Sequence, residues 1–210
     1  MTDPRAEAGS TDTGAAVSGW SNTRAYRCWA DAARATPTAR LKPGTRDMER
    51  ILVSACLAGM PVRYDGSAKT LAAAHLQRWR DEGRLVVLCP EVAAGFGTPR
   101  RPAEIQLRRS GADVLNGTAC IRDDTGADVT ALFIDGARRA LAQAVAHGCR
   151  YALLADGSPS CGSHYVYDGT FSRIAHQAAG VTAALLERHR IRVFAPSAID
   201  ALAALIDAGR

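Results

Sequence analysis

The chain has 210 residues, of which 47% are hydrophobic and 22% charged, a composition typical of one globular domain of ordinary size with a tail. No apolar run approaches the ~18 residues that a membrane-spanning helix requires, so we expect no membrane partner. The net charge of +5 is too small to predict a nucleic-acid partner. The N-terminus resembles neither a secretion signal nor an organellar transit peptide, so we expect a cytoplasmic location.

Residues 1–47 are the part of the sequence least suited to folding. Only Val17 and Leu41 represent the Leu, Ile, Val and Phe set there, among many Ala, Thr, Gly, Ser and Arg residues. Such a segment cannot offset its ordering entropy by burial. We therefore predict a disordered N-terminal extension over 1–47 and a folded α/β domain over 48–210. Met48, which stands just before the first apolar run, is a candidate for the true start of the protein.

From position 50 on, short apolar runs alternate with segments of helical periodicity. The first run, 50–55, predicts a strand, and it is followed by a predicted helix over 69–82 that ends at a glycine. A second strand is predicted at 85–88. The segment 95–126 contains several Gly and Pro residues, which predict an irregular excursion with short strand-like pieces such as 103–107.

The second half of the chain continues the alternation. Thr130 is a candidate cap for a helix that runs to about His147, where apolar residues recur at helical spacing. The remaining predicted elements are a strand at 151–155, a helix at 181–189, a strand at 191–194 and a helix that begins at Ser197. Repeated alternation predicts an α/β fold, a Rossmann-like sandwich with a mostly parallel sheet and helices on both faces.

Three of the six cysteines follow predicted strands. Cys56 follows the first strand, Cys89 follows the second, and Cys161 lies in the loop after the third. The carboxyl ends of parallel strands meet at one edge of a sheet, where ligands bind, so we expect these thiols to lie close together. The other cysteines do not fit this pattern and are predicted to be small buried side chains or incidental thiols: Cys28, Cys120 and Cys149.

Three convergent thiolates are soft ligands suited to zinc or to an iron–sulfur cluster. Electron-carrying clusters usually have four protein ligands, so a set of three would leave one iron open to a substrate. On spacing alone, unligated loop cysteines explain the pattern equally well, because no C-x-x-C pair is present.

Two polar residues accompany the cysteines. Glu91 stands two positions after Cys89, and Ser158 stands three positions before Cys161. A carboxylate beside a metal site can act as a general base, and a hydroxyl can orient a leaving atom. In isolation, a surface salt bridge explains such a glutamate and a turn cap explains such a serine.

Five stretches of the sequence share a pattern with a known family: SACLAGMPVRYDG (54–66), LCPEVAAGFGTPRRPAEI (88–105), DVTALFIDGA (128–137), DGSPSCGSHYVYDGTF (156–171) and GVTAALLERHRIRVF (180–194). Together they resemble the thiouracil desulfurase family, over essentially all of residues 50–194. The resemblance implies a 4Fe-4S cluster held by Cys56, Cys89 and Cys161. It further implies that the fourth iron is free to bind the sulfur of a thiocarbonyl substrate.

The resemblance also implies a reaction and residue roles. The substrate would be a small-molecule thiolated pyrimidine, thiouracil or thiouridine monophosphate, which is converted without net redox change to the oxo form plus sulfide. Glu91 corresponds to the glutamate of the CPE motif and would take a proton from the attacking water, and Ser158 corresponds to the catalytic serine of the SPSC motif. Tyr64 and Arg100 are candidates for substrate binding, although they could equally pin the loops to each other. The sequence predicts no oligomeric state.

Three other functions stay open at this point. A non-enzymatic zinc protein would add His164, three residues after Cys161, to the three cysteines. A hydrolase would use one cysteine as a nucleophile and would need no metal. A tRNA thiouridine desulfidase is disfavoured by the weak basic excess.

Overall fold

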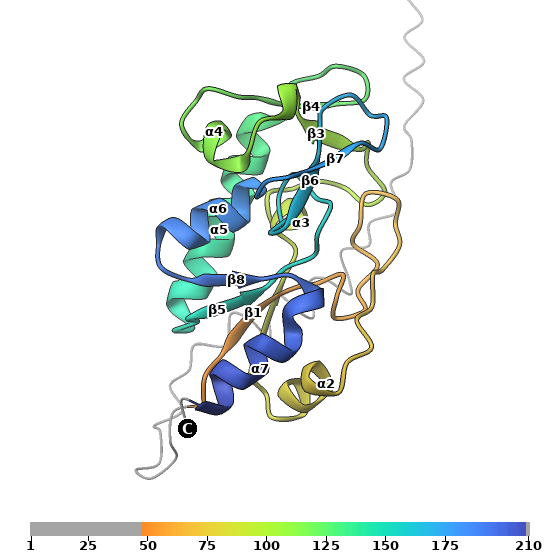
Figure 1. Ribbon diagram of the computed structural model, residues 1–210. Helices are drawn as coiled ribbons and strands as arrows, with labels where there is room; N and C mark the ends of the chain where they lie inside the picture. Colours follow the sequence, from red (N-terminus) through yellow and green to blue (C-terminus); the bar gives the residue numbers. More distant parts are fainter. Residues whose placement is uncertain (1–47, 209–210) are drawn as a thin grey trace, which may run out of the picture. The chain divides into compact units, whose positions relative to one another are not determined.

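A four-stranded parallel sheet forms the centre of the fold in the computed structural model, which describes residues 48–208 (Figure 1). The predicted extension and Cys28 lie outside the described residues. The strand order is β2-β1-β5-β8, with β1 (Ile51–Ser54), β2 (Leu85–Leu88), β5 (Tyr151–Leu153) and β8 (Arg192–Phe194). All four residues of β1 are buried, as expected for an inner strand that is covered on both faces.

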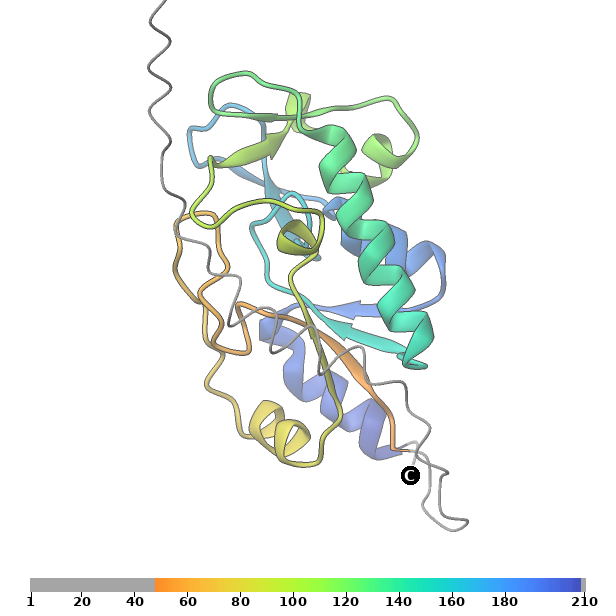
Figure 2. The same ribbon diagram turned by 180° about the vertical axis from the view of Figure 1, so that it is seen from behind.

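Two pairs of helices cover the two faces of the sheet (Figures 1 and 2). One pair is α2 (Ala74–Asp81) and α7 (Ile199–Ala208), and the other is α5 (Thr130–Ala146) and α6 (Val181–Arg188). Side chains alternate along β1, so that Val53 packs with Trp79 of α2 while Leu52 packs with Ala140 of α5 and Leu186 of α6. The predicted fold class is confirmed. None of the helices in residues 48–208 combines the length and apolarity that crossing a membrane would take.

Shorter elements extend the fold beyond the carboxyl edge of the sheet. They form two antiparallel strand pairs, β3 with β4 and β6 with β7, and a third apolar core that includes Ile105, Ile121 and Val166. The elements are α3 (Pro90–Ala93), β3 (Ala103–Ile105), the 3-10 turn η1 (Gln106–Arg108), α4 (Gly111–Leu115), β4 (Ile121–Asp123), β6 (Tyr165–Tyr167) and β7 (Ala175–Gln177), with a second 3-10 turn, η2 (Pro196–Ala198), before α7. The region predicted as an irregular excursion therefore contains a strand pair and a short helix.

Three predicted helix starts differ from the structure. The helix predicted from Ser197 begins at Ile199, because Ser197 belongs to the 3-10 turn η2. The helix predicted from position 69 begins at Ala74, because the N–H group of Lys69 donates to the carbonyl of Cys56 at 3.0 Å and holds the segment extended along the first cysteine loop. Thr130 is the first residue of α5 rather than its cap. Its hydroxyl accepts the N–H of Ile121 at 2.8 Å, which ties α5 to β4.

Candidate functional site

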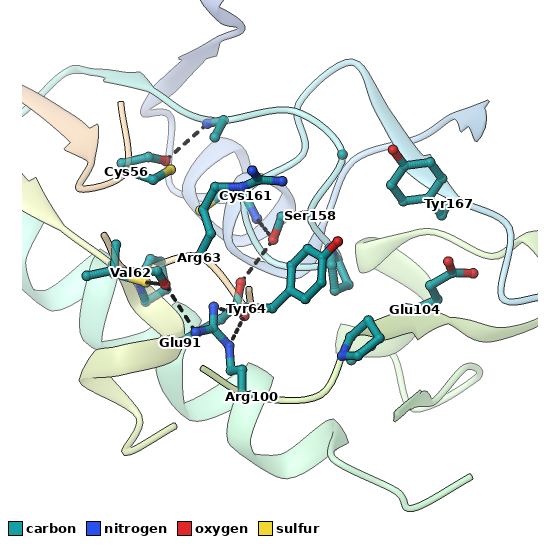
Figure 3. A pocket seen from close by; sticks show the side chains of 18 of the residues that line it. Cys56, Val62, Arg63, Tyr64, Glu91, Arg100, Glu104, Ser158, Cys161 and Tyr167 are labelled. Carbon is teal, nitrogen blue, oxygen red and sulfur yellow. Dashed lines mark hydrogen bonds and ion pairs between the residues drawn. The ribbon is translucent and has the colours of Figure 1, made fainter. Parts of the chain in front are cut away.

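Cys56, Cys89 and Cys161 line one cavity of about 610 Å³ at the carboxyl edge of the parallel sheet. The first two cysteines follow β1 and β2, and the third lies in the loop between β5 and β6. Because β1 pairs with β2 on one side and with β5 on the other, the three loops leave neighbouring strands at the same edge. The four other predicted site residues line the same cavity: Tyr64, Glu91, Arg100 and Ser158 (Figure 3).

The two other described cysteines stand apart from this cavity. Cys149 is 4% exposed and belongs to the apolar core between the sheet and α5 and α6. Cys120 is half-buried just before β4. The structure therefore separates the three cysteines that follow the parallel strands from the two that do not.

The loop that carries Cys161 rests on the first turn of α6. The N–H group of Val181 donates to the carbonyl of Pro159 at 2.8 Å, so the loop supplies a partner for the start of the helix. This close approach requires Gly180, since a Cβ there would lie 2.5 Å from the carbonyl oxygen of Ser160. The position of Cys161 thus depends on a residue of another element.

Helix α5 supports the second cysteine loop in a comparable way. Cys89 is the N-cap residue of the short helix α3, which begins at Pro90. A Cβ at Gly136 of α5 would lie 2.5 Å from the carbonyl oxygen of Pro90. Glycine therefore allows α5 to pack directly on the backbone beside Cys89.

Both carboxylate oxygens of Glu91 are engaged (Figure 3). Arg100 donates to Oε2 from Nε at 2.9 Å and from Nη2 at 2.6 Å, and Ser158 donates from Oγ to Oε1 at 3.0 Å. The side chains of Arg100 and Glu91 are 9% and 12% exposed, so this ion pair is largely removed from water. The Nη1 group of Arg100 donates to the carbonyl of Val62 at 3.1 Å. This geometry favours the loop-pinning role of Arg100 over direct substrate binding.

The hydroxyl of Ser158 combines the two roles that its sequence position suggests. Besides donating to Glu91, Oγ accepts the N–H group of Ser160 at 3.0 Å and that of Cys161 at 3.3 Å. The serine is thus a turn cap for the third cysteine loop and a direct partner of the candidate base. One side chain therefore links the candidate general base to a candidate metal ligand.

Tyr64 lines the cavity and is more exposed to solvent than Glu91 and Arg100. The residue is 42% exposed, and the guanidinium of Arg63 lies 5.7 Å from the centre of its ring. Its carbonyl accepts the N–H of Arg100 at 2.7 Å, which ties the first loop to the second. The backbone of Tyr64 therefore pins the loops, while its ring faces the cavity.

Burial is the main cause of a raised pKa in all three thiols. It raises the pKa of Cys89 to about 11, with a smaller contribution from the Glu91 carboxylate. Burial also raises the pKa of Cys56 and holds the pKa of Cys161 well above the usual range of a thiol. A nucleophilic cysteine needs a lowered pKa, so these shifts do not support the hydrolase hypothesis. A cysteine that binds a metal loses its proton on binding, so a raised pKa of the free thiol is compatible with a ligand role.

The donor set fits a cluster better than a single ion. In the described part of the chain, no three His, Cys, Asp or Glu side chains are grouped as ligands of one metal ion. In a 4Fe-4S cluster each thiolate binds a different iron, so cysteines from three separate loops suit it. His164, the fourth ligand of the zinc hypothesis, lies on a different cavity, which it shares with Gln177 and Phe194. The structure therefore does not join His164 to the cysteines.

Several cavity residues were missed by the sequence analysis. Asp156 accepts the backbone N–H groups of Ser163 and His164, each at 2.9 Å, and so shapes the third cysteine loop. Glu104 is 8% exposed and stands in β3. The signal that could have identified it is a single acidic residue within the strand-like piece 103–107. Tyr167, Phe171 and Arg173 come from the hairpin of β6 and β7, which the sequence did not predict.

Comparison with known proteins places this arrangement in a family. The profile of the 2-thiouracil desulfurase family matches residues 51–197. The uncharacterized protein YbbK of Bacillus subtilis (strain 168) is 45% identical over 150 residues, which cover 71% of this chain and 97% of that protein. Among solved structures, the 4Fe-4S-dependent thiouracil desulfidase TudS is 44% identical, with a TM-score of 0.69 over 76% of this chain and 99% of the other. The chain therefore belongs to the 2-thiouracil desulfurase family.

Proposed function

We propose that this protein is a 4Fe-4S-dependent desulfurase that converts a thiolated pyrimidine to its oxo form and sulfide. The observation that carries the proposal is that Cys56, Cys89 and Cys161 share a cavity with the hydrogen-bonded pair Glu91 and Ser158. Family membership and the similarity to a solved 4Fe-4S-dependent thiouracil desulfidase support it.

The three cysteines would hold the cluster, one thiolate from each loop. When bound, the cluster supplies a Lewis-acidic iron that has no protein ligand and that suits the soft sulfur of a thiocarbonyl group. The loops that carry Cys89 and Cys161 are seated on α5 and α6, so the protein itself sets the spacing of the ligands.

The reaction replaces C=S by C=O and needs no electron transfer. Water supplies the oxygen, and both of its hydrogens leave with the sulfur as hydrogen sulfide. We assign Glu91 as the base that takes a proton from the attacking water. Its Oε2 is held by Arg100, whereas among residues 48–208 the hydrogen-bond partner of Oε1 is the neutral hydroxyl of Ser158, so we assign Oε1 as the oxygen that receives the proton. Ser158 steadies the carboxylate and can relay the proton.

The cavity has room for more than a free base. Its volume of about 610 Å³ lies within the range of about 300–1,000 Å³ that is usual for small-molecule sites. Arg173 lines it and has no ion-pair partner among residues 48–208, so its guanidinium is available to an anionic group. Thiouridine monophosphate is therefore a candidate substrate beside thiouracil.

Anaerobic reconstitution followed by an activity assay tests the proposal. We expect brown protein with about four irons per chain that releases uracil and sulfide from 2-thiouracil or 4-thiouracil. Cys56→Ala, Cys89→Ala and Cys161→Ala should each lose iron, whereas the matched controls Cys120→Ala and Cys149→Ala should keep it. Stoichiometric zinc without iron uptake, or full activity of the metal-free protein, would contradict the proposal.

A further inference from the structure

Glu104 connects two separate strand pairs at the wall of the cavity. It belongs to β3, and its Oε2 accepts the N–H groups of Gly169 at 2.9 Å and of Phe171 at 3.0 Å, both in the loop between β6 and β7. Figure 3 shows Cys56 and Glu104 at opposite ends of the site. A largely buried carboxylate thus holds the backbone of a loop on the side of the cavity away from Cys56.

The loop between β6 and β7, residues 168–174, also packs against the backbone that follows β3. Gly169 has a φ of +93°, and a Cβ at this position would lie 2.7 Å from the Cα of Gln106. The N–H of Arg108 donates to the carbonyl of Asp168 at 3.0 Å. The 168–174 loop is therefore held at Asp168, Gly169 and Phe171, and Glu104 holds the last two.

Backbone strain is concentrated at this contact. Five residues other than glycine have a positive φ in the described part of the chain, and four of them lie here: Leu107 (60°), Arg108 (53°), Phe171 (59°) and Arg173 (60°). Such conformations persist only where the surrounding structure imposes them, and they concentrate at functional sites. Phe171 lines the cavity and is 36% exposed, so burial in a core does not account for its strained backbone.

We propose that Glu104 is a positioning residue, which fixes the 168–174 loop so that Phe171 forms the wall against which the substrate ring rests. The inference rests on the proposed function, because a thiolated pyrimidine is a flat ring that stacks on an aromatic face. Glu104 contributes through its hold on the backbone of Gly169 and Phe171 and takes no part in the proton transfer at Glu91.

The test compares four variants of the reconstituted full-length protein: Glu104→Ala, Glu104→Gln, Phe171→Ala and the double variant of Glu104→Ala with Phe171→Ala. Loss of ring stacking should raise KM for 2-thiouracil and 4-thiouracil by roughly 5- to 100-fold in the two single alanine variants, with iron content and kcat little changed. Both N–H groups donate to one oxygen, which glutamine retains, so Glu104→Gln should keep KM within about threefold of wild type. The double variant should match Phe171→Ala, because Glu104 acts through that ring.

Hydrogen exchange provides a measurement that does not depend on catalysis. The amides of Gly169 and Phe171 should exchange faster in Glu104→Ala and at the wild-type rate in the control Glu187→Ala, which changes an exposed residue of α6. An unchanged KM in Phe171→Ala would overturn the inference even if Glu104→Ala failed to fold. A fall in kcat or in iron content in Glu104→Ala that is as large as the rise in KM would also overturn it. So would a KM in the double variant that exceeds the KM of Phe171→Ala by the factor seen in Glu104→Ala. Absence of desulfuration by iron-replete wild-type protein would instead overturn the proposed function.

Discussion

Arg100 binds a single oxygen of Glu91 through two nitrogens, which leaves the second oxygen of Glu91 to the hydroxyl of Ser158. The arginine thereby fixes the direction in which the free lone pairs of the carboxylate point. Because the pair is largely buried, the arginine also balances a negative charge that the cavity would otherwise hold unpaired.

Glu91→Gln should keep the iron content and lower turnover by roughly 10²- to 10⁴-fold, the usual effect of losing a general base. The glutamine amide has the same shape but cannot take up the proton of the attacking water. Uracil release under anaerobic conditions, beside iron analysis, measures both effects. Glu187→Gln on α6 is the matched control and should leave both unchanged. Full activity of Glu91→Gln with normal iron content would contradict the assigned role.

Arg100→Lys separates the two roles that the sequence left open. Lysine keeps the charge but replaces the fork of Nε and Nη2 by a single ammonium group, so Glu91 loses one of its bonds to the arginine. If Arg100 positions Glu91, kcat should fall by roughly 10-fold or more, as expected for a lost hydrogen bond to a charged group, while KM stays close to wild type. A raised KM with normal kcat would show that Arg100 binds the substrate instead.

Gly180→Ala should impair iron binding although Gly180 lies outside the cavity. Its φ of −74° suits alanine, so the effect comes from the added Cβ, which would lie 2.5 Å from the carbonyl oxygen of Ser160 and displace the loop that carries Cys161. Gly117→Ala is the control, because its φ of +74° strains the backbone but its Cβ would meet no atom within 4 Å. Iron per chain after reconstitution is the measurement. Equal iron binding in the two variants would argue against the dependence of the Cys161 loop on its packing against α6 at Gly180.

A protein that begins at Met48 should keep the melting temperature and activity of the full chain, as the predicted domain boundary requires. A protein that begins at Arg50 should melt lower by roughly 2–8 °C, because it loses a hydrogen bond to a buried group and, in addition, the exposed ion pair of Glu49 with Arg150. That bond runs from Nε of Arg84, a residue 2% exposed, to the carbonyl of Glu49 at 2.8 Å. Calorimetry of the two truncated proteins makes the comparison. Insolubility of the protein that begins at Met48 would place part of residues 1–47 in the folded domain.

The sequence predicted the parts of the fold that local patterns specify. The strand at 85–88 was predicted with its observed bounds, because a purely apolar run lies between Gly83 and Pro90, both of which interrupt regular structure. The start of α2 was misplaced because apolar residues continue the helical spacing while hydrogen bonds to the first cysteine loop hold the segment extended.

Some residues of the candidate site could likewise be predicted from local sequence patterns, and others could not. Residues next to parallel strands, such as Cys56 and Cys89, could be placed at one edge of the sheet from their sequence positions. The contribution of Glu104 could not be predicted, because its partner Gly169 is 65 positions away in a hairpin of three-residue strands. Strands that short have no readable alternation, so only the tertiary structure shows the contact.

The seating of the cysteine loops on α5 and α6 has a consequence for how the enzyme matures. Cys56 and Cys89 leave the ribosome well before Gly180, the residue that lets α6 approach the loop of Cys161. Until that helix has been synthesised and has docked, the loop of Cys161 lacks the hydrogen bond that Pro159 accepts from Val181. Cluster insertion is therefore expected to follow synthesis of the C-terminal part of the domain, which makes loading a post-translational step performed on a nearly finished fold.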